Sequence, residues 1–479
     1  MEQPLTLACF YSGLVICGAC LGVRAEEAAE RAPAKDGLEG ECILETVNSR
    51  ETIPLAARTA FALEAGEGGA GPSLAWGASL ERKTPVAEIL SIQFPLRAAP
   101  RAPLSLFLRD GTELRGAVPA PQNTARDKPG DKDSVSFLAE GVAAETFRIP
   151  LDHVKGLLVH APLDAPAAGS SPPTGAKAGR NPSPASPAQS ARLRNEILRS
   201  RPRKDLLVLL EGGKSPGVLD SIGKDGVHFS SESLGDVHVQ LDKLRSVILA
   251  ELGDDPKAEP KPAPAGNAPA SVHVLLRDAS TVVGTLAGFE QGHVKVKTRH
   301  LGEQRLSLER VVELSFRGGR LSYLSDLEPT RVEERIPLAF KPNAYPFQRD
   351  LSVVESPLRI GGREFTKGLG VHAYSQLEFD LGGAYKRFQA TIGLDETARP
   401  TSNEVTGIEG AVTFRVKLDG SLLLEKPMTW KDAPEAIDLD VSQGKRLVLE
   451  VDCGKPEETA TEFNSVLDRA NWASARVVK

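Results

Sequence analysis

Apolar and polar residues alternate along most of this chain, and Asp-Gly or Gly-Gly pairs often separate two alternating runs. An alternation with a period of two predicts strands with one buried face, and the glycine dipeptides predict tight hairpin turns. The pattern is clear in LSLFLRDGTELRGAV (104–118), LLVLLEGGKSPGVLDSI (206–222) and VHVLLRDASTVVGTLAGF (272–289). We therefore expect an all-β protein.

A second pattern follows these hairpins and marks an internal repeat. PLDHVKGLLV (150–159), QLDKLRSVIL (240–249) and SLERVVELSF (307–316) share a Leu-acid pair followed by apolar residues at fixed positions. A weaker copy, PVAEILSIQF (85–94), keeps only the apolar positions. The sequence thus predicts three or four copies of one small β unit, each ending in a short turn and a final strand. Such units typically close into small barrels of the SH3-like or Sm-like kind.

Two segments have the composition of linkers. Residues 161–192 and 252–270 are rich in Pro, Ala, Ser and Gly, so we expect disordered, semi-rigid spacers there. The remaining boundaries follow from the strand patterns. We expect two small β units in 40–160, one barrel repeat in 203–251, another in 271–318 and a β-sandwich in 325–479.

Residues 1–25 have the features of an export signal. LTLACFYSGLVICGACLG (5–22) is apolar over the length of a signal core, and Ala25 offers a small residue for cleavage. A cleaved signal, an uncleaved membrane anchor and a lipid attached at Cys20 are the alternatives, and contact with the membrane arises only through this segment. We expect an extracytoplasmic protein, in the periplasm, on the cell surface or secreted. Cys42 and Cys453, the cysteines outside this segment, form neither a disulfide framework nor a zinc site.

Charge and motifs exclude some classes of function. The formal net charge is −6, and the sequence shows no basic stripe of the kind that nucleic-acid binders usually have. We therefore expect no nucleic-acid partner. The sequence has no HExxH or P-loop pattern, and small strand units between linkers leave little room for a usual catalytic domain. We therefore expect no enzyme activity.

The last part of the chain continues the strand pattern without a linker. Its alternating segments include QLEFDLGG (376–383), RFQATIGLD (387–395), AVTFRVKLDG (411–420) and KRLVLEVDCG (445–454), which predict an antiparallel sandwich or jelly roll. Together with PLRIGGREFTKGLGVHAYSQLEFDLGG (357–383) and DRANWASARV (468–477), they resemble the NPCBM family of carbohydrate-binding modules. The resemblance implies a galactose-binding-like jelly roll, a fold often attached to glycoside hydrolases or to secreted proteins.

One loop departs from the pattern of the family. Cys453 stands where an acid is expected, the glycine run after it is missing, and Arg469 stands where the family has His. Asp468, Asn471 and Trp472 keep their places. Whether this loop still binds sugar or a metal ion stays open, and the sequence shows no clear calcium motif and no cofactor site.

Several residues of this part are candidates for contact with a sugar. A neutral imidazole at His372 could donate to one hydroxyl and accept from another, or it could tie down the glycine-rich turn. Three aromatic residues could stack on a sugar ring: Trp430, Tyr374 and Trp472. The alternative for Trp472 is a buried position in the core of the sandwich. Asp395 and Glu396 could accept from hydroxyls, hold calcium or form a solvated turn. The full set is His372, Tyr374, Asp395, Glu396, Trp430, Asp468, Asn471 and Trp472.

These observations favour a secreted or periplasmic glycan-binding protein without catalysis. Small modules on linkers multiply weak contacts with an oligosaccharide or polysaccharide. The alternative is a structural scaffold that has lost sugar binding and contacts other envelope proteins. An accessory part of a glycoside hydrolase is less favoured, because hydrolysis needs two carboxylates placed across the bond and no segment identifies them.

Overall fold

In this computed structural model, the described residues are 40–46, 49–55, 60–65, 72–77, 80–96, 98, 102–120, 134–143, 146–160, 187–251, 271–317, 320–335, 345–399, 409–454 and 467–479. The predicted signal segment, residues 161–186 of the first predicted linker, the second predicted linker and residues 455–466 of the altered loop lie outside them. Within the described residues, no helix is long and apolar enough to cross a membrane.

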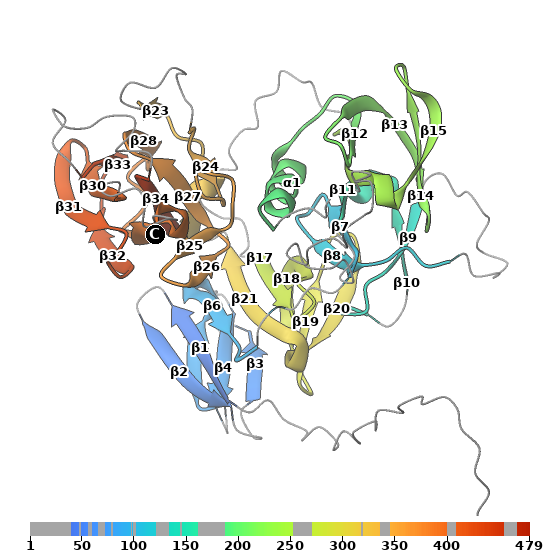
Figure 1. Cartoon of the computed structure of the whole chain (residues 1–479). Helices are drawn as coiled ribbons and strands as arrows, with labels where there is room; N and C mark the ends of the chain where they lie inside the picture. Colours follow the sequence, from blue (N-terminus) through green and yellow to red (C-terminus); the bar gives the residue numbers. More distant parts are fainter. Residues whose placement is uncertain are drawn as a thin grey trace, which may run out of the picture. The chain divides into compact units, whose positions relative to one another are not determined.

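Four β units follow one another from residue 40 to residue 317 (Figure 1). The first contains β1 (Gly40–Thr46), β2 (Arg50–Leu55), β3 (Ala60–Glu64), β4 (Ser73–Gly77), β5 (Arg82–Pro85), the 3-10 helix η1 (Val86–Glu88) and β6 (Ile89–Gln93). The second contains β7 (Leu104–Leu108), β8 (Glu113–Gly116), β9 (Ser134–Leu138), β10 (Thr146–Pro150), η2 (Leu151–His153) and β11 (Val154–Val159). The third contains β12 (Asp205–Leu209), β13 (Lys214–Ile222), β14 (Gly226–Ser231), β15 (Gly235–Gln240), η3 (Leu241–Lys243) and β16 (Leu244–Ile248). The fourth contains β17 (Ser271–Leu276), β18 (Thr281–Glu290), β19 (His293–Lys297), β20 (Glu303–Ser307), η4 (Leu308–Arg310) and β21 (Val311–Arg317).

The four units share one arrangement. In each, the first strand pairs with both the second and the last strand, as β7 does with β8 and β11. A 3-10 helix directly precedes each last strand, where the sequence predicts a short turn and a final strand. The acid of each Leu-acid pair lies in that helix. The predicted repeat is therefore present, whereas its SH3-like or Sm-like kinship stays a prediction.

Last strands join the units in pairs within a 16-stranded sheet. In the second and third units, β11 runs antiparallel to β16 and places Leu157 opposite Val247. In the first and fourth units, β21 runs antiparallel to β6 and places Leu314 opposite Ile92. All four residues occupy the same position of the repeat, so both pairs have the same local two-fold arrangement.

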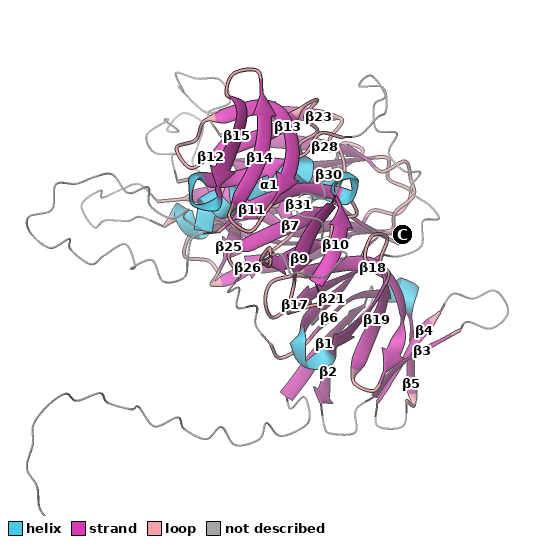
Figure 2. Cartoon of the chain, turned by 90° about the vertical axis from the view of Figure 1, so that its right-hand side faces the viewer, coloured by secondary structure: helices cyan, strands magenta, loops and turns pink. Residues whose placement is uncertain are grey.

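One helix corrects the predicted linker boundary. Residues 187–192, assigned to the linker 161–192, begin α1 (Pro187–Arg199), the one α-helix of the described residues (Figure 2). Ile197 of this helix is fully buried against Phe107, Leu158 and Ile248. The burial of this apolar residue on β7, β11 and β16 stabilises the helix, although the local composition is that of a linker.

The C-terminal part forms two facing antiparallel sheets and a separate two-stranded hairpin at 358–365, which confirms the predicted β-sandwich. One sheet has the order β24-β27-β34-β29-β32, with β22 paired to β34, and the other has the order β23-β28-β33-β30-β31. The elements are β22 (Leu321–Tyr323), η5 (Leu324–Asp326), β23 (Arg331–Glu334), β24 (Gln348–Arg349), β25 (Leu358–Ile360), β26 (Arg363–Phe365), β27 (Gly368–His372), β28 (Ser375–Asp380), β29 (Arg387–Leu394), η6 (Glu396–Ala398), β30 (Ala411–Leu418), β31 (Ser421–Thr429), β32 (Glu435–Asp440), β33 (Arg446–Cys453) and β34 (Arg469–Val478).

Alternate residues of these strands fill the space between the sheets. Trp472 is fully buried, with its ring centroid 4.9 Å from that of Phe414 in an edge-on contact and 6.4 Å from that of Phe388. Leu377, Phe379, Ile392 and Val412, which come from the alternating segments of the sequence, belong to the same buried cluster. The period-two pattern of the sequence thus describes the core of the sandwich correctly.

The glycine-rich signature has a steric cause at two positions. Gly368 has φ +148°, and a Cβ there would lie 2.6 Å from the carbonyl oxygen of Trp472. A Cβ on Gly370 would lie 2.4 Å from the carbonyl oxygen of Leu351. Both clashes are with backbone, which cannot move away as a flexible side chain can.

Replacing Gly370 by alanine is therefore expected to destabilise the sandwich by about 1–3 kcal/mol, the usual cost of overpacking. Denaturant unfolding of the full chain measures this. Gly213→Ala is a less crowded comparison, because a Cβ at Gly213 would lie 4.0 Å from Cδ1 of Leu209, an ordinary contact distance. An equal loss in the two variants would show that contact with Leu351 is not the cause.

Candidate functional site

Several candidates lie at one end of the sandwich, where β28 and β34 begin and β29 ends. The strand register places His372 opposite Arg469 and Leu394 opposite Ala470. The backbone N–H of Ala373 donates to the carbonyl of Asp468, 3.0 Å away. This contact links the segment between β27 and β28 to the start of β34. We call this end the Gly-rich rim.

His372 lies beneath an aromatic ring at this rim. Its side chain is 3% exposed, and its ring stacks on Tyr345 with centroids 4.9 Å apart and planes 11° apart. Its Nδ1 lies 2.5 Å from the carbonyl oxygen of Ala373. The geometry favours the alternative in which His372 supports the turn, and it brings Tyr345 over the imidazole.

Tyr374 is half-buried and has a guanidinium over its ring. The Cζ of Arg335 lies 4.5 Å from the ring centroid, within range of a cation–π contact. Backbone hydrogen bonds in both directions, each 2.9 Å, hold Arg335 beside Tyr374. Burial raises the pKa of the Tyr374 hydroxyl, and the nearby Glu450 carboxylate adds to this effect. The pair offers a planar surface and hydrogen-bond donors at the rim.

Asp395 and Asn471 are hydrogen-bonded to each other inside the rim, and Oδ1 of Asn471 is buried without a partner. Asp395 is 2% exposed and caps η6, accepting from the N–H of Thr397 at 3.0 Å and from its hydroxyl at 2.6 Å. The amide Nδ2 of Asn471 donates to the Oδ2 of Asp395 at 2.6 Å. Glu396 accepts from the N–H of Gly362 at 2.6 Å. These partners account for the three polar residues as supports of the rim.

The remaining candidates divide between core and edge. Trp472 is enclosed in the core, the alternative considered for it. Asp468 is 2% exposed and accepts from the N–H of Ala411 at 2.9 Å. Trp430 follows β31, packs partly against the core and has the ammonium of Lys431 over its ring at 5.4 Å. The residue is half-buried, with Nε1 of its indole shielded from solvent.

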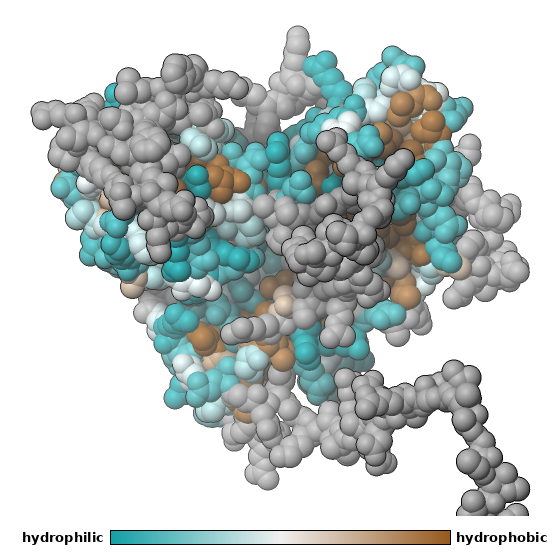
Figure 3. Space-filling view, viewed as in Figure 1, coloured by the Kyte–Doolittle hydropathy of each residue, from teal (hydrophilic) through white to brown (hydrophobic). Residues whose placement is uncertain are grey.

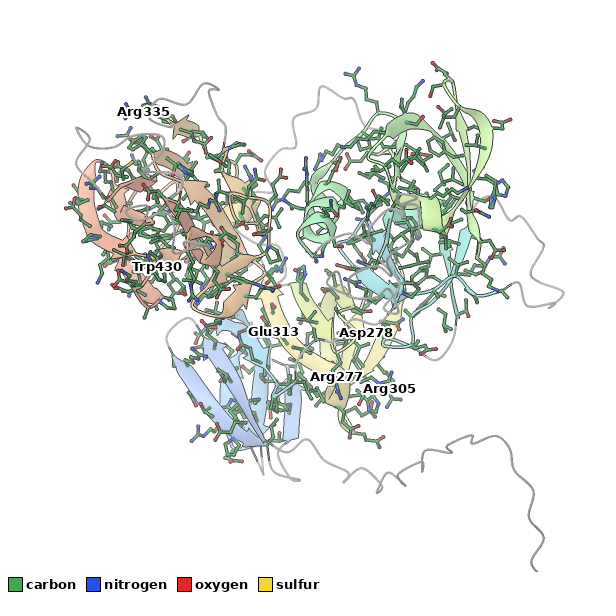
Figure 4. All side chains as sticks on the ribbon, viewed as in Figure 1. Arg277, Asp278, Arg305, Glu313, Arg335 and Trp430 are labelled. Atoms are coloured by element: carbon green, nitrogen blue, oxygen red, sulfur yellow. The ribbon has the colours of Figure 1, made fainter. Side chains whose placement is uncertain are left out.

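Strand order separates the two half-buried aromatic candidates. Tyr374 precedes β28 and Trp430 follows β31, three strands away in the order β28-β33-β30-β31. At the usual strand spacing this is about 14 Å. Figure 4 shows Arg335 and Trp430 on different sides of the sandwich. One monosaccharide therefore cannot contact both rings, although an oligosaccharide can.

The acids close to Tyr374 have cationic partners. Glu333 pairs with Arg331, and Glu450 accepts from Arg415 at 2.8 Å and from Lys417 at 2.6 Å. Burial raises the pKa of Glu334, whose Oε1 accepts from the N–H of Phe347. In the described ranges, no group of three or more His, Cys, Asp or Glu side chains could hold a metal ion. The rim thus offers aromatic rings and hydrogen-bonding groups.

Sequence reasoning missed two members of this group. Arg335 and Tyr345 lie on either side of residues 336–344, and neither belongs to an alternating run that would have marked it. An aromatic residue beside prolines in KPNAYPFQ (341–348) was the available signal for Tyr345.

The two-sheet fold and the aromatic, hydrogen-bonding rim define a β-sandwich binding module. Residues 320–478 match the family model described as the NPCBM/NEW2 domain. The C-terminal sandwich is therefore an NPCBM domain, as the sequence motifs predict.

Other proteins match parts of the chain. A Renibacterium salmoninarum protein named "Putative endo-alpha-N-acetylgalactosaminidase" is 31% identical over 96 residues, which are 20% of this chain and 6% of that protein. The solved CBM51 from Clostridium perfringens GH95 in complex with methyl-galactose is 20% identical, covers 33% of this chain and 99% of its own, and has a TM-score of 0.27. CBM51-2 with GlcNAc and INT domains from Clostridium perfringens ZmpB is 17% identical, covers 53% of this chain and 44% of its own, and has the same TM-score.

Proposed function

We propose that this protein binds glycans without catalysis and that the Gly-rich rim of the NPCBM domain makes the contact. The domain match over residues 320–478 carries the proposal. The geometry of Tyr374 and Arg335 adds a ring for stacking on the C–H face of a sugar and donors for its hydroxyls. Where the sandwich carries colour in Figure 3, its surface is mainly hydrophilic, as suits a polar ligand.

The four β units support a role in presentation rather than in chemistry. They repeat one small arrangement, and strands of all four units pair within one 16-stranded sheet. We propose that the chain acts outside the cytoplasm, where such modules meet polysaccharides. An N-terminal sequence of the mature protein purified from its host would test this, because retention of Met1 in a soluble protein would contradict cleavage of a signal.

A glycan array probed with the full chain tests the binding itself. Tyr374→Ala is expected to weaken binding to the glycan that is retained by about tenfold, since loss of a stacked ring costs about 1–1.5 kcal/mol. Trp430→Ala reports whether an oligosaccharide extends across the rim. Retention of no glycan by the folded chain would contradict the proposal.

A matched control lies at the opposite end of the sandwich. There Thr330, Glu378, Asp380, Asp419, Lys445 and Arg446 line a groove of 470 Å³. Arg446→Gln is expected to leave glycan binding unchanged. If binding survives Tyr374→Ala and disappears in Arg446→Gln, the sugar occupies this groove and the rim is not the site.

A further inference from the structure

Two histidines face each other on the third β unit. The Cα register of β14 and β15 places His228 directly opposite His238, and their ring centroids lie 4.6 Å apart with 41° between the planes. Both residues are exposed, and β15 ends the strand order of the 16-stranded sheet. Figure 2 shows these strands side by side. Neither ring fills a core, so packing does not explain the pair.

The spacing of the rings suits one metal ion. Cross-strand neighbours have Cβ atoms about 4.5–5.5 Å apart, which lets two side chains reach a common point above the sheet. A metal bound by two imidazoles at about 2.0–2.1 Å from each nitrogen needs those nitrogens about 3 Å apart. Rings whose centroids lie 4.6 Å apart reach this separation when their edges lean together. Imidazole is a preferred ligand of Zn²⁺, Cu²⁺ and Ni²⁺.

The surroundings of the pair also favour a cation. The hydroxyl of Ser230 lies 3.0 Å from Oδ2 of Asp220 and 2.5 Å from Oδ1 of Asp236. A hydroxyl has one proton to donate, so it satisfies one of these carboxylates at a time. Alternate residues of a strand share a face, which places Ser230 on the face of His228 and Asp236 on that of His238. Two carboxylates thus create a negative field beside the imidazoles.

Nε2 of His238 lies close to a glycine of the neighbouring strand. A Cβ on Gly226 would lie 2.2 Å from the carbonyl oxygen of Val239 and 2.9 Å from Nε2 of His238. The clash with the Val239 backbone already requires glycine at this position, so the glycine itself is not evidence for a ligand.

A second histidine pair provides an internal comparison. The rings of His153 and His300 have centroids 4.3 Å apart, but both ring nitrogens of His300 and Nδ1 of His153 are shielded from solvent. A metal ion from solution reaches the exposed pair without any rearrangement and does not reach this one.

We propose that His228 and His238 form a two-histidine site for a divalent transition-metal ion that prefers imidazole ligands. Water occupies the other coordination positions, because the described residues offer no third His, Cys, Asp or Glu ligand placed to complete a site. The ion joins the edge strand β15 to β14 and stabilises the outer hairpin of the unit. The site is independent of glycan binding at the rim.

Isothermal titration calorimetry with Zn²⁺ tests the proposal. It uses the full chain after EDTA treatment and alkylation of its cysteines. One ion per chain is expected to bind and to raise the thermal unfolding temperature, since a ligand of the folded state stabilises it. His228→Gln and His238→Gln are each expected to weaken binding at least tenfold, while the apo proteins unfold as the wild type does.

His300→Gln is the matched control and is expected to bind Zn²⁺ as the wild type does. Equal affinity in the wild type and in His228→Gln would overturn the proposal, as would a loss of binding confined to His300→Gln. A chain that binds no Zn²⁺ at millimolar concentration would overturn it too.

Discussion

Replacing Trp472 by alanine is expected to lower the free energy of unfolding of the C-terminal sandwich by about 3–5 kcal/mol. The side chain is 0% exposed and fills the space between Phe388 and Phe414 on opposite sheets. Its removal takes away the largest fully buried side chain and leaves a cavity that the sheets close only in part. Chemical denaturation followed by far-ultraviolet circular dichroism measures the change.

Trp430 provides the control for this prediction. It is half-buried at the end of β31 and packs against the same core only at its margin. Trp430→Ala is expected to cost clearly less than Trp472→Ala. Equal losses in the two variants would mean that Trp472 does not occupy the centre of the sandwich.

Replacing Glu113 by glutamine is expected to cost about 3 kcal/mol, because it removes one partner of a buried ion pair. Glu113 is 2% exposed and lies between two cations, 2.7 Å from Nε of Arg194 and 3.4 Å from Nε of Arg115. The hydroxyl of Ser105 donates to it at 2.9 Å. Arg194 belongs to α1, so the variant also weakens the contact of this helix with the second unit.

The loss should depend on pH. Burial alone would raise the pKa of Glu113, but Arg194, Arg115 and the hydrogen bonds outweigh burial and lower it. A carboxyl whose pKa is lower in the folded state stabilises the protein above the unfolded-state pKa, and this stabilisation disappears as the pH falls through the folded-state pKa. The difference between wild type and Glu113→Gln is therefore expected to be largest near neutral pH and to shrink in acid.

An exposed ion pair supplies the comparison. Glu232 pairs with Lys204 at 2.7 Å, but its side chain is 90% exposed. Solvent screens such a pair, so Glu232→Gln is expected to leave the unfolding curve unchanged at every pH. A matching change in the two variants would point to a general effect of net charge.

The strands and the repeat could be predicted because they depend on local pattern. Alternation over 411–420 defines β30 and its inward residues, and the Leu-acid pairs mark the 3-10 helices before the last strands. The interpretation of Trp472 as a core residue also depends on local pattern, since Trp472 lies on the inward face of β34. Patterns of this kind need no knowledge of distant residues.

Other features depend on residues far apart in the chain. Helix α1 is stabilised by Phe107 and Ile248, which the composition of residues 187–199 does not reveal. The separation of Tyr374 from Trp430 follows from the order of four strands. The stacking of Tyr345 on His372 depends on a loop whose sequence has no alternation of apolar and polar residues. The sequence therefore indicated residues that gather at the Gly-rich rim but not which of them are buried.

The pairing of the β units determines the order in which they can fold during synthesis. The second and third units are neighbours in the chain, so β11 finds β16 as soon as residue 248 has left the ribosome or translocon. The first unit finishes earlier, yet its partner strand β21 begins only at Val311. Until then β6 presents an unpaired edge, the kind of surface on which nascent chains aggregate. A chaperone that shields strand edges would thus be needed most for the unit that is made first.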